Sequence, residues 1–331
     1  AHQEQRAVAA LDEAHGAHGE RRRHRAHDPP PGPGGQPLVE AQQEEVEAVA
    51  QLQRATLDEM RVRWREEDAL LRTLELRAEM EVQAVRTQRD DTHGLEQQLA
   101  TLRSSADYER SWDNERPLVS VRIATYDRTD ALIDVAIESV LRQTYDNIEI
   151  VVVNDGPNAV TRTAIEALGE SKIRFSELPK RGLYPVDAHL RWMVAGAPAM
   201  NEAARLARGD WIAPLDDDDE FAADHIEKLV ALACAERAEF AYGALIQRDM
   251  VEGVDRVVYS DPPRIGAFSF QSTLYLSGLR FFEYDVESWR VGEPADWNLA
   301  RRMVGAGVRM VSTDEVHAFM NSTRFDKRGD S

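Results

Sequence analysis

A long stretch without proline limits what this chain of 331 residues can fold into. Residues 39–103 contain one glycine, Gly94, and are rich in Glu, Gln, Arg, Ala and Leu, which favour helix. At 1.5 Å per residue, a helix of this length would extend roughly 100 Å, which is more than a globular domain can cover. The stretch therefore predicts a long helix that a single compact core cannot bury.

A seven-residue hydrophobic repeat runs along this helix. With a positions counted from residue 57 and d positions from residue 60, ten of fourteen seam positions are apolar. Such a repeat is typical of a coiled coil. We expect residues 39–110 to form a coiled coil that joins copies of the chain into a homo-oligomer. The alternative is a helix that packs on its own domain. The apolar seam residues are Leu57, Met60, Trp64, Leu71, Leu74, Ala78, Val85, Leu95, Leu99 and Leu102.

Composition excludes several classes of function. The chain has 59 Asp and Glu against 40 Lys and Arg, a net charge of −19, which repels nucleic acid and anionic lipid. Cys234 is the only cysteine, so neither an intrachain disulfide nor a multi-cysteine zinc site is available. Apolar runs are too short for a transmembrane segment, which leaves only peripheral membrane contact, and no signal sequence is evident. We expect a cytoplasmic protein without a nucleic-acid partner.

The chain divides into four parts. Residues 1–38 include a proline-rich patch and predict a flexible lead-in. Pro117 marks the end of the helical part, because proline cannot continue a helix. We expect a second domain over residues 116–322, followed by a C-terminal tail, residues 323–331.

Short β-branched runs alternate with amphipathic segments after Pro117. This alternation predicts an α/β fold with a mixed, mostly parallel sheet flanked by helices. The expected strands are 119–124, 148–153, 172–178, 211–215 and 309–311, and the expected helices are 131–142, 159–168, 200–207, 223–235 and 297–304.

Polar residues follow three of these strands, where α/β sheets bind their ligands. Thr125 to Arg128 follow the first strand, Asp155 the second, and Asp216 to Asp219 the strand at 211–215. Four adjacent carboxylates repel one another, and a divalent cation such as Mn²⁺ or Mg²⁺ is the simplest remedy. The alternative is a solvated acidic turn before the next helix.

Four segments in order resemble a known family. They are PLVSVRIATYDR from Pro117, SVLRQTY from Ser139, EIVVVNDG from Glu149 and GDWIAPLDDDD from Gly209. Together they resemble the family 2 glycosyltransferases with the GT-A nucleotide-sugar-binding, Rossmann-like fold, whose last motif contains the DXD sequence. The resemblance runs from about residue 117 to residue 319.

The resemblance implies a metal-dependent, inverting glycosyltransferase. It would move a sugar from a nucleoside-diphosphate sugar to a hydroxyl-bearing acceptor, such as a glycan, a lipid-linked sugar or a natural product. Asp218 would hold the Mn²⁺ or Mg²⁺ that bridges the diphosphate. The residues implied to bind the donor are Thr125, Tyr126, Asp127, Arg128, Asp155, Arg191, Asp216 and Asp217.

The family also has a late catalytic motif, E-D-W-D-L, which the segment Asp296-Trp297-Asn298-Leu299 resembles. The match implies that Asp296 is the general base, and one base is enough for an inverting transfer. Ala295 replaces the usual acid before it, so Glu293 is a second candidate. A helix cap is the alternative role for Asp296.

Several interpretations remain open at this stage. Arg181 or Arg191, around an inserted segment at 182–192, could pair with a donor phosphate. His317 is either a further metal ligand or an ordinary buried histidine, and the aromatic residues between Phe268 and Trp289 either line an acceptor cleft or fill the core. Two other functions remain: a nucleotide-binding coiled-coil scaffold with an inactive transferase domain, and a sugar nucleotidyltransferase. The latter usually has a glycine-rich loop after its first strand, which this chain lacks.

Overall fold

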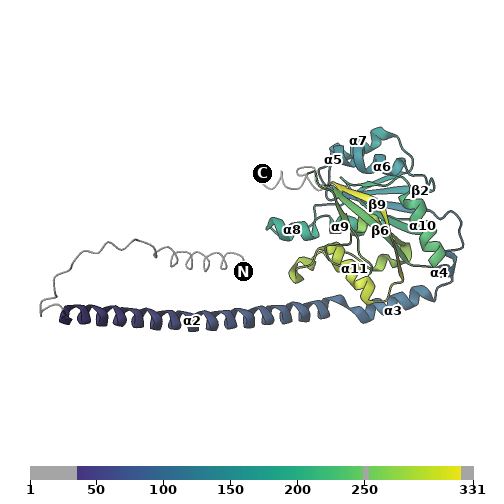
Figure 1. Cartoon of the computed structure of the whole chain (residues 1–331). Helices are drawn as coiled ribbons and strands as arrows, with labels where there is room; N and C mark the ends of the chain where they lie inside the picture. Colours follow the sequence, from purple (N-terminus) through teal and green to yellow (C-terminus); the bar gives the residue numbers. More distant parts are fainter. Residues whose placement is uncertain (1–35, 249–252, 322–331) are drawn as a thin grey trace, which may run out of the picture. The chain divides into compact units, whose positions relative to one another are not determined.

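The computed structural model describes residues 36–248 and 253–321. The expected lead-in up to residue 35 and the C-terminal tail lie outside the described residues. Helices α2 (Gln36–Asp90), α3 (Thr92–Arg103) and α4 (Ala106–Arg110) precede the sheet in the chain (Figure 1). In the part of the chain that the structure describes, no helix is long and apolar enough to cross a membrane.

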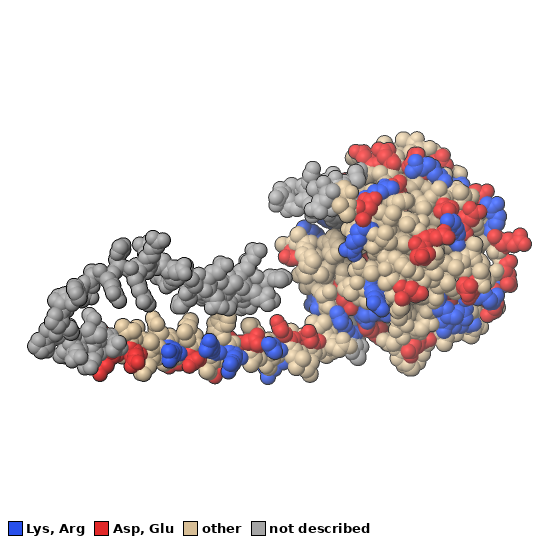
Figure 2. All heavy atoms as spheres, viewed as in Figure 1, with Lys and Arg blue, Asp and Glu red and all other residues tan. Residues whose placement is uncertain are grey.

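The long helix expected from the sequence is confirmed as α2 and α3, with a break between them. Asp91 lies in the left-handed region with φ 40°, which Asp tolerates better than most residues, and its side chain accepts a hydrogen bond from the backbone N–H of Gly94. Acidic and basic side chains are interspersed along α2 (Figure 2). Leu57, Met60 and Trp64 of the repeat are exposed on it. The coiled coil stays a prediction for this helix.

The last apolar positions of the repeat pack within the chain instead. Leu95 and Leu99 of α3 are buried in the main hydrophobic core, and Leu102 packs against that core. A Cβ atom on Gly278 would lie 2.6 Å from Cδ1 of Leu102, so this side chain occupies the space beside that glycine. For α3, the alternative of a helix packed on its own domain is therefore the observed one.

The sheet has the order β3-β2-β1-β4-β8-β6-β9-β5, with β7 paired to β6. Strands β3, β2, β1 and β4 are mutually parallel, while β5, β7 and β8 run antiparallel to their neighbours. The expected mixed, mostly parallel α/β fold is confirmed. The strands are β1 (Val119–Thr125), β2 (Ile148–Asn154), β3 (Ile173–Glu177), β4 (Trp211–Asp216), β5 (Glu220–Phe221), β6 (Phe240–Arg248), β7 (Arg256–Val258), β8 (Thr273–Leu276) and β9 (Met310–Asn321).

Helices connect and cover these strands. The segment after β1 forms α5 (Thr129–Ala131), a π-helical turn at Leu132–Ile137 and α6 (Glu138–Leu141). The other helices are α7 (Ala159–Leu168), α8 (Ala188–Val194), α9 (Ala197–Leu206), α10 (His225–Glu236) and α11 (Ala295–Gly305). Helix α9 packs on β1 and β2, and α10 packs on β6. Short 3-10 turns lie at Phe270–Ser272, Ser277–Phe281 and Ser288–Val291.

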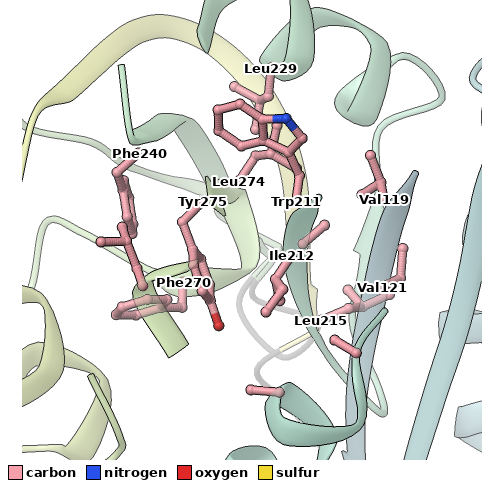
Figure 3. Close-up of a cluster of buried hydrophobic side chains, with 14 of the residues drawn as sticks. Val119, Val121, Trp211, Ile212, Leu215, Leu229, Phe240, Phe270, Leu274 and Tyr275 are labelled. Carbon is pink, nitrogen blue, oxygen red and sulfur yellow. The ribbon is translucent and has the colours of Figure 1, made fainter. Parts of the chain in front are cut away.

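The core lies on both sides of β1 and β4. Figure 3 shows Val119 and Val121 of β1 beside Trp211, Ile212 and Leu215 of β4, all of which are fully buried. Aromatic side chains extend this core toward β8 and β6. Of the aromatic group that the sequence left open, Phe270, Tyr275, Phe282 and Tyr284 are buried there, which is the core-packing alternative.

Candidate active site

Three parallel strands end at one edge of the sheet and carry predicted site residues to it. Thr125 at the end of β1 pairs with Asn154 at the end of β2, and Asp216 ends β4 beside the same end of β1. The backbone N–H of Asp155 donates to the carbonyl of Thr125 at 2.7 Å. Strand register therefore brings Thr125 and Asp155 to the same edge as residues Asp216–Asp219, which we call the acidic loop.

The acidic loop is held by donors from both ends of the domain. Thr125 Oγ1 donates to Oδ2 of Asp217 at 2.8 Å. The backbone N–H of Asn321 donates to Oδ1 of Asp219 at 2.9 Å, and its side-chain amide donates to the carbonyl of Asp218 at 2.7 Å. The last residue of β9 thus fixes the loop from the opposite side to β1.

The charge of the acidic loop is only partly balanced. Arg128 Nη1 lies 3.2 Å from Oδ1 of Asp217 and 2.7 Å from Oδ2 of Asp218. Burial nevertheless raises the pKa of Asp217 to about 7, although the Arg128 guanidinium opposes this shift. Burial, together with the charges of Asp216 and Asp218, raises the pKa of Asp219 well above its ordinary value. Buried carboxylates with raised pKa values favour a further positive charge beside them.

The donor set fits a hard divalent cation that a ligand helps to hold. All of the candidate ligands are carboxylate oxygens, which suit Mg²⁺ and Mn²⁺. Among residues 36–248 and 253–321, no three His, Cys, Asp or Glu side chains converge as a complete metal site. A cation at Asp218 would therefore need oxygens from a bound molecule, as Mg²⁺ commonly does with phosphates.

Asp155 is buried and accepts two hydrogen bonds from the inserted segment. Gly182 N–H donates to Oδ1 at 2.8 Å, and the hydroxyl of Tyr184 donates to Oδ2 at 2.6 Å. Gly156 has a φ of 104°, and a Cβ there would lie 2.9 Å from the backbone nitrogen of Arg181. Only glycine at 156 lets the inserted segment come this close to Asp155.

Tyr126, in the turn after β1, presents an exposed aromatic ring. Its carbonyl accepts from the side-chain amides of Asn154 and Asn158 at 3.2 and 2.9 Å, which fixes the backbone of the turn. The guanidinium of Arg181 lies 3.8 Å from the ring centroid of Tyr126, in a cation–π contact. Arg181, one of the two arginines left open by the sequence, thus belongs to this side of the site.

Two residues predicted to bind the donor take no part in the contacts described above. Asp127 is exposed at the turn after β1. Arg191 lies on α8, and its Nη1 donates to the carbonyl of Val186 at 3.0 Å. Within the described residues, Arg191 makes no contact with the acidic loop. A role for either residue in donor binding stays a prediction.

Asp296 lies in the first turn of α11, directly after Pro294 and Ala295. Its Oδ1 accepts from the backbone N–H of Trp297 at 2.6 Å, whereas the N-cap position of the helix is Pro294, so Asp296 is not the helix cap. Burial raises the pKa of Asp296 to about 6, and the charge of Asp216 adds to this shift. A separate helix thus adds a further carboxylate with a raised pKa to those of the acidic loop.

His317 lies in β9 and is fully buried. Its ring packs edge-to-face against His225 with centroids 5.6 Å apart, and a Cβ on Gly243 would lie 2.1 Å from its Cδ2. Burial lowers the pKa of His317. Neither ring nitrogen of His317 has a hydrogen-bond partner among the described residues, so the choice between a metal ligand and an ordinary buried histidine stays open.

Several residues at this edge could not be found from motif patterns. The amide of Gln271 donates to Oδ2 of Asp216, and Arg122 in the middle of β1 donates to the hydroxyl of Tyr284. Arg122 is the less expected of these, because it stands at a buried position of a central strand. In the sequence, the one sign of this buried position was a charged residue within a mostly apolar run.

Comparison with known proteins identifies the family. A model of glycosyl transferase family 2 matches residues 120–287, just over half of the chain. The chain therefore belongs to glycosyl transferase family 2, and its fold is GT-A-like, as the resemblance of the four segments implied. The matched range contains β1, Asp155 and the acidic loop, whereas Asp296 lies beyond it.

Individual relatives cover the same part of the chain. The match to WfaP of Escherichia coli, a UDP-Glc:α-D-GlcNAc-diphosphoundecaprenol β-1,3-glucosyltransferase, is 31% identical over 149 residues, or 45% of this chain and 53% of WfaP. WfgD of Escherichia coli, which carries the same activity name, is 30% identical over 128 residues, or 38% of this chain and 45% of WfgD. The chain spans about half the length of these curated relatives. A structure of Staphylococcus aureus TarS (residues 1–349) with UDP aligns with a TM-score of 0.49 at 16% identity, covering 62% of this chain and 60% of that one.

Proposed function

We propose that this chain is a metal-dependent, inverting glycosyltransferase that moves a sugar from a nucleoside-diphosphate sugar to a hydroxyl-bearing acceptor. The observation that carries the proposal is the acidic loop, whose buried carboxylates lie with the Arg128 guanidinium at the ends of parallel strands. The proposal adds Asp296 of α11, a carboxylate whose pKa is raised to about 6 by burial. The acidic loop is suited to bind a diphosphate with its cation, and Asp296 is suited to accept a proton.

The donor would bind across the ends of β1 and β2. Asp155 has no proton to donate while Gly182 and Tyr184 both donate to it, so it suits a nucleobase that offers an N–H group. The ring of Tyr126 offers a flat surface for the same base. The name of WfaP specifies a UDP-sugar donor, which supports this class of donor.

The leaving diphosphate would lie over the acidic loop. A divalent cation held by Asp218 and the diphosphate would neutralise charge on the departing nucleoside diphosphate. Arg128, between Asp217 and Asp218, keeps these carboxylates oriented and supplies positive charge beside them. Thr125 holds Asp217 from the other side.

Asp296 would act as the general base. A carboxylate with a pKa of about 6 is ionised at neutral pH, yet it is a better proton acceptor than an ordinary aspartate. It would take the proton of the acceptor hydroxyl as that oxygen attacks the anomeric carbon opposite the leaving group. A cytoplasmic location and a homo-oligomer joined through the exposed seam of α2 belong to this proposal.

The proposal is tested by measuring release of nucleoside diphosphate from UDP-glucose, UDP-N-acetylglucosamine, GDP-mannose and dTDP-glucose, each with Mn²⁺, Mg²⁺ or EDTA. We expect slow hydrolysis of one donor that depends on the metal and is lost in Asp296→Asn. The exposed carboxylate Asp130 offers a matched control through Asp130→Ala. Binding of a nucleotide without any turnover would favour the scaffold, and release of pyrophosphate from a nucleoside triphosphate and a sugar phosphate would favour the nucleotidyltransferase.

A further inference from the structure

A network of ion pairs joins the end of α2 to the start of α11. Arg301 of α11 donates from Nη1 to Oδ2 of Asp90 at 2.6 Å and from Nη2 to Oδ1 of Asp90 at 3.0 Å. The same guanidinium donates from Nε and Nη2 to the two oxygens of Glu293 at 3.0 and 2.9 Å. Arg301 therefore bridges two carboxylates, one on each side of α11.

Glu293 is the buried centre of this network. It is 2% exposed, and besides Arg301 it is contacted by Arg86 Nη2 at 3.2 Å and by the amide of Asn298 at 2.8 Å. Both of its oxygens thus accept from several donors. A carboxylate bound in this way is poorly suited to take a proton from a substrate, so Glu293 has a different use from the base role that the sequence left open for it.

The network holds α11 on both sides of Asp296. Glu293 precedes the helix by two residues, whereas Asn298 and Arg301 follow Asp296 within the next one and a half turns. A helix presents its side chains in directions that depend on its rotation about its own axis. Attaching Glu293 and Arg301 to α2 therefore constrains the direction in which the Asp296 carboxylate points.

We infer that Asp90 is a positioning residue for Asp296, acting through Arg301 and Glu293. This inference rests on the proposed function, in which Asp296 is the general base. Removing the charge of Asp90 leaves Arg301 with one carboxylate partner instead of two, which loosens one attachment of α11 although its apolar face stays packed in the core. Misplacing a catalytic group by a fraction of an ångström lowers turnover more than it lowers donor binding.

The test compares Asp90→Asn with Asp91→Asn in the full chain. Asn at 90 keeps the size of the side chain but removes its charge. Asp91 is the adjacent carboxylate and makes no contact with Arg301 in the described chain. Asn at 91 tolerates the left-handed backbone there and can still cap α3. The two variants therefore differ in the ion pair with Arg301.

We expect Asp90→Asn to lower kcat for metal-dependent UDP-glucose hydrolysis about tenfold while KM changes less than about twofold. Hydrogen exchange should speed up at the amides of residues 296–301 and stay unchanged in β1 and β4. Asp91→Asn should match the wild type, and Asp90→Glu should recover part of kcat. Unchanged kcat and exchange in Asp90→Asn, or faster exchange across the whole sheet, would overturn the inference. If the wild-type chain hydrolyses no donor, the proposed function fails, whereas exchange at residues 296–301 still tests the positioning.

Discussion

The hydroxyl of Tyr184 donates a 2.6 Å hydrogen bond to Oδ2 of Asp155. Gly182 N–H donates to the other oxygen, so one inserted segment supplies a donor to each oxygen of a carboxylate that is 3% exposed. Donors placed in this way fix the plane of the carboxylate. The insertion therefore prepares Asp155 to accept a hydrogen bond from a nucleobase.

Tyr184→Phe should weaken binding of the preferred nucleoside diphosphate by about fivefold, because a hydrogen bond of this kind contributes about 1 kcal/mol. Calorimetry with UDP, GDP and dTDP in the presence of Mn²⁺ measures the effect. Leu183→Ala is the matched control, since Leu183 is 85% exposed in the same segment. Tighter binding in Tyr184→Phe would show instead that Tyr184 competes with the base.

Asp296 should give turnover a distinctive pH dependence. Its pKa is raised to about 6, and the base must be ionised to act, so kcat should fall about tenfold per pH unit below 6 and level off above 7. Asp296→Asn should remove this dependence and lower kcat by about 10²-fold or more, while donor affinity is retained. Hydrolysis rates between pH 5 and 8 provide the measurement, and a wild-type profile that is flat across pH 6 would contradict the assignment.

The same carboxylate should reduce stability at neutral pH. Because the folded-state pKa is raised above the ordinary aspartate value of about 3.8, folding favours the protonated form, and that stabilisation is lost as the pH rises through about 6. At pH 7.5, Asp296→Asn should therefore unfold at a higher temperature than the wild type. Its free energy of unfolding should be larger by roughly 1 kcal/mol, a value reduced for the partial exposure of the side chain. At pH 4 the two proteins should differ little. Thermal melts at pH 7.5 and pH 4 measure the effect. A less stable Asn variant at pH 7.5 would mean that losing the hydrogen bond from the backbone N–H of Trp297 to the carboxylate costs more than the charge does.

Asp218→Ala should uncouple nucleotide binding from the metal. In the wild type we expect EDTA to weaken nucleoside diphosphate binding at least tenfold, since the cation would offset repulsion between diphosphate and acidic loop. In Asp218→Ala the difference between Mn²⁺ and EDTA should largely disappear. Asp130→Ala, at an exposed carboxylate, should behave as the wild type. Equal wild-type affinities with and without EDTA would rule against a metal at this loop.

Two N-terminal deletions should differ in their effect on the fold: the shorter one should leave it intact, and the longer one should disrupt it. A chain that starts at residue 76 retains Leu95, Leu99 and Trp112, which are buried, and should keep its melting temperature. A chain that starts at residue 115 also loses Arg103, which donates to the fully buried Glu239 at 2.7 and 2.8 Å. That deletion leaves a buried charge unpaired and exposes the core, so we expect an unfolded or aggregated product. A well-folded 115–331 chain would show that α3 is dispensable.

Light scattering on the same proteins tests the coiled coil. The exposed seam residues Leu57, Met60, Trp64, Leu71 and Leu74 all precede residue 76, so the full chain should be a multimer and the chain from residue 76 a monomer. A monomeric full-length protein would contradict the coiled-coil prediction.

Strands β1, β2 and β4 were predictable because each is a short, largely apolar run. The expected strand 119–124 is observed as 119–125, and 148–153 as 148–154, and both are buried throughout. Strands β5, β6, β7 and β8 were missed, and β9, which pairs in parallel with β6, was predicted only at its start. Strand β8 has four residues between two 3-10 turns, and β6 shifts register on β9 between Tyr242 and Ala244. Such strands form through pairing between distant segments, which local periodicity does not record.

The residues of the candidate site also divide into those that strand ends predict and those that only tertiary packing places. Thr125, Asp155 and Asp216 were predicted to meet at one edge of the sheet, and they do so because the end of a parallel strand fixes where the next residue lies. Their roles in donor binding stay predictions. The residues that support them could not be found in this way. Asn321 reaches Asp219 from the last strand, and Tyr184 reaches Asp155 from an insertion without a periodic pattern. Their positions depend on tertiary packing.

Because Gly243 fits tightly against His317, substitutions at these two positions depend on each other. A Cβ on residue 243 would lie 2.1 Å from the imidazole ring and 2.9 Å from the carbonyl of Glu315, so not even alanine fits while the histidine is in place. A lineage that replaced the glycine first would carry a damaged β6–β9 pairing until residue 317 became smaller. The order of change is therefore constrained, because residue 317 must become smaller before a side chain can appear at 243. Aligned descendants should show the two substitutions together or the substitution at 317 alone.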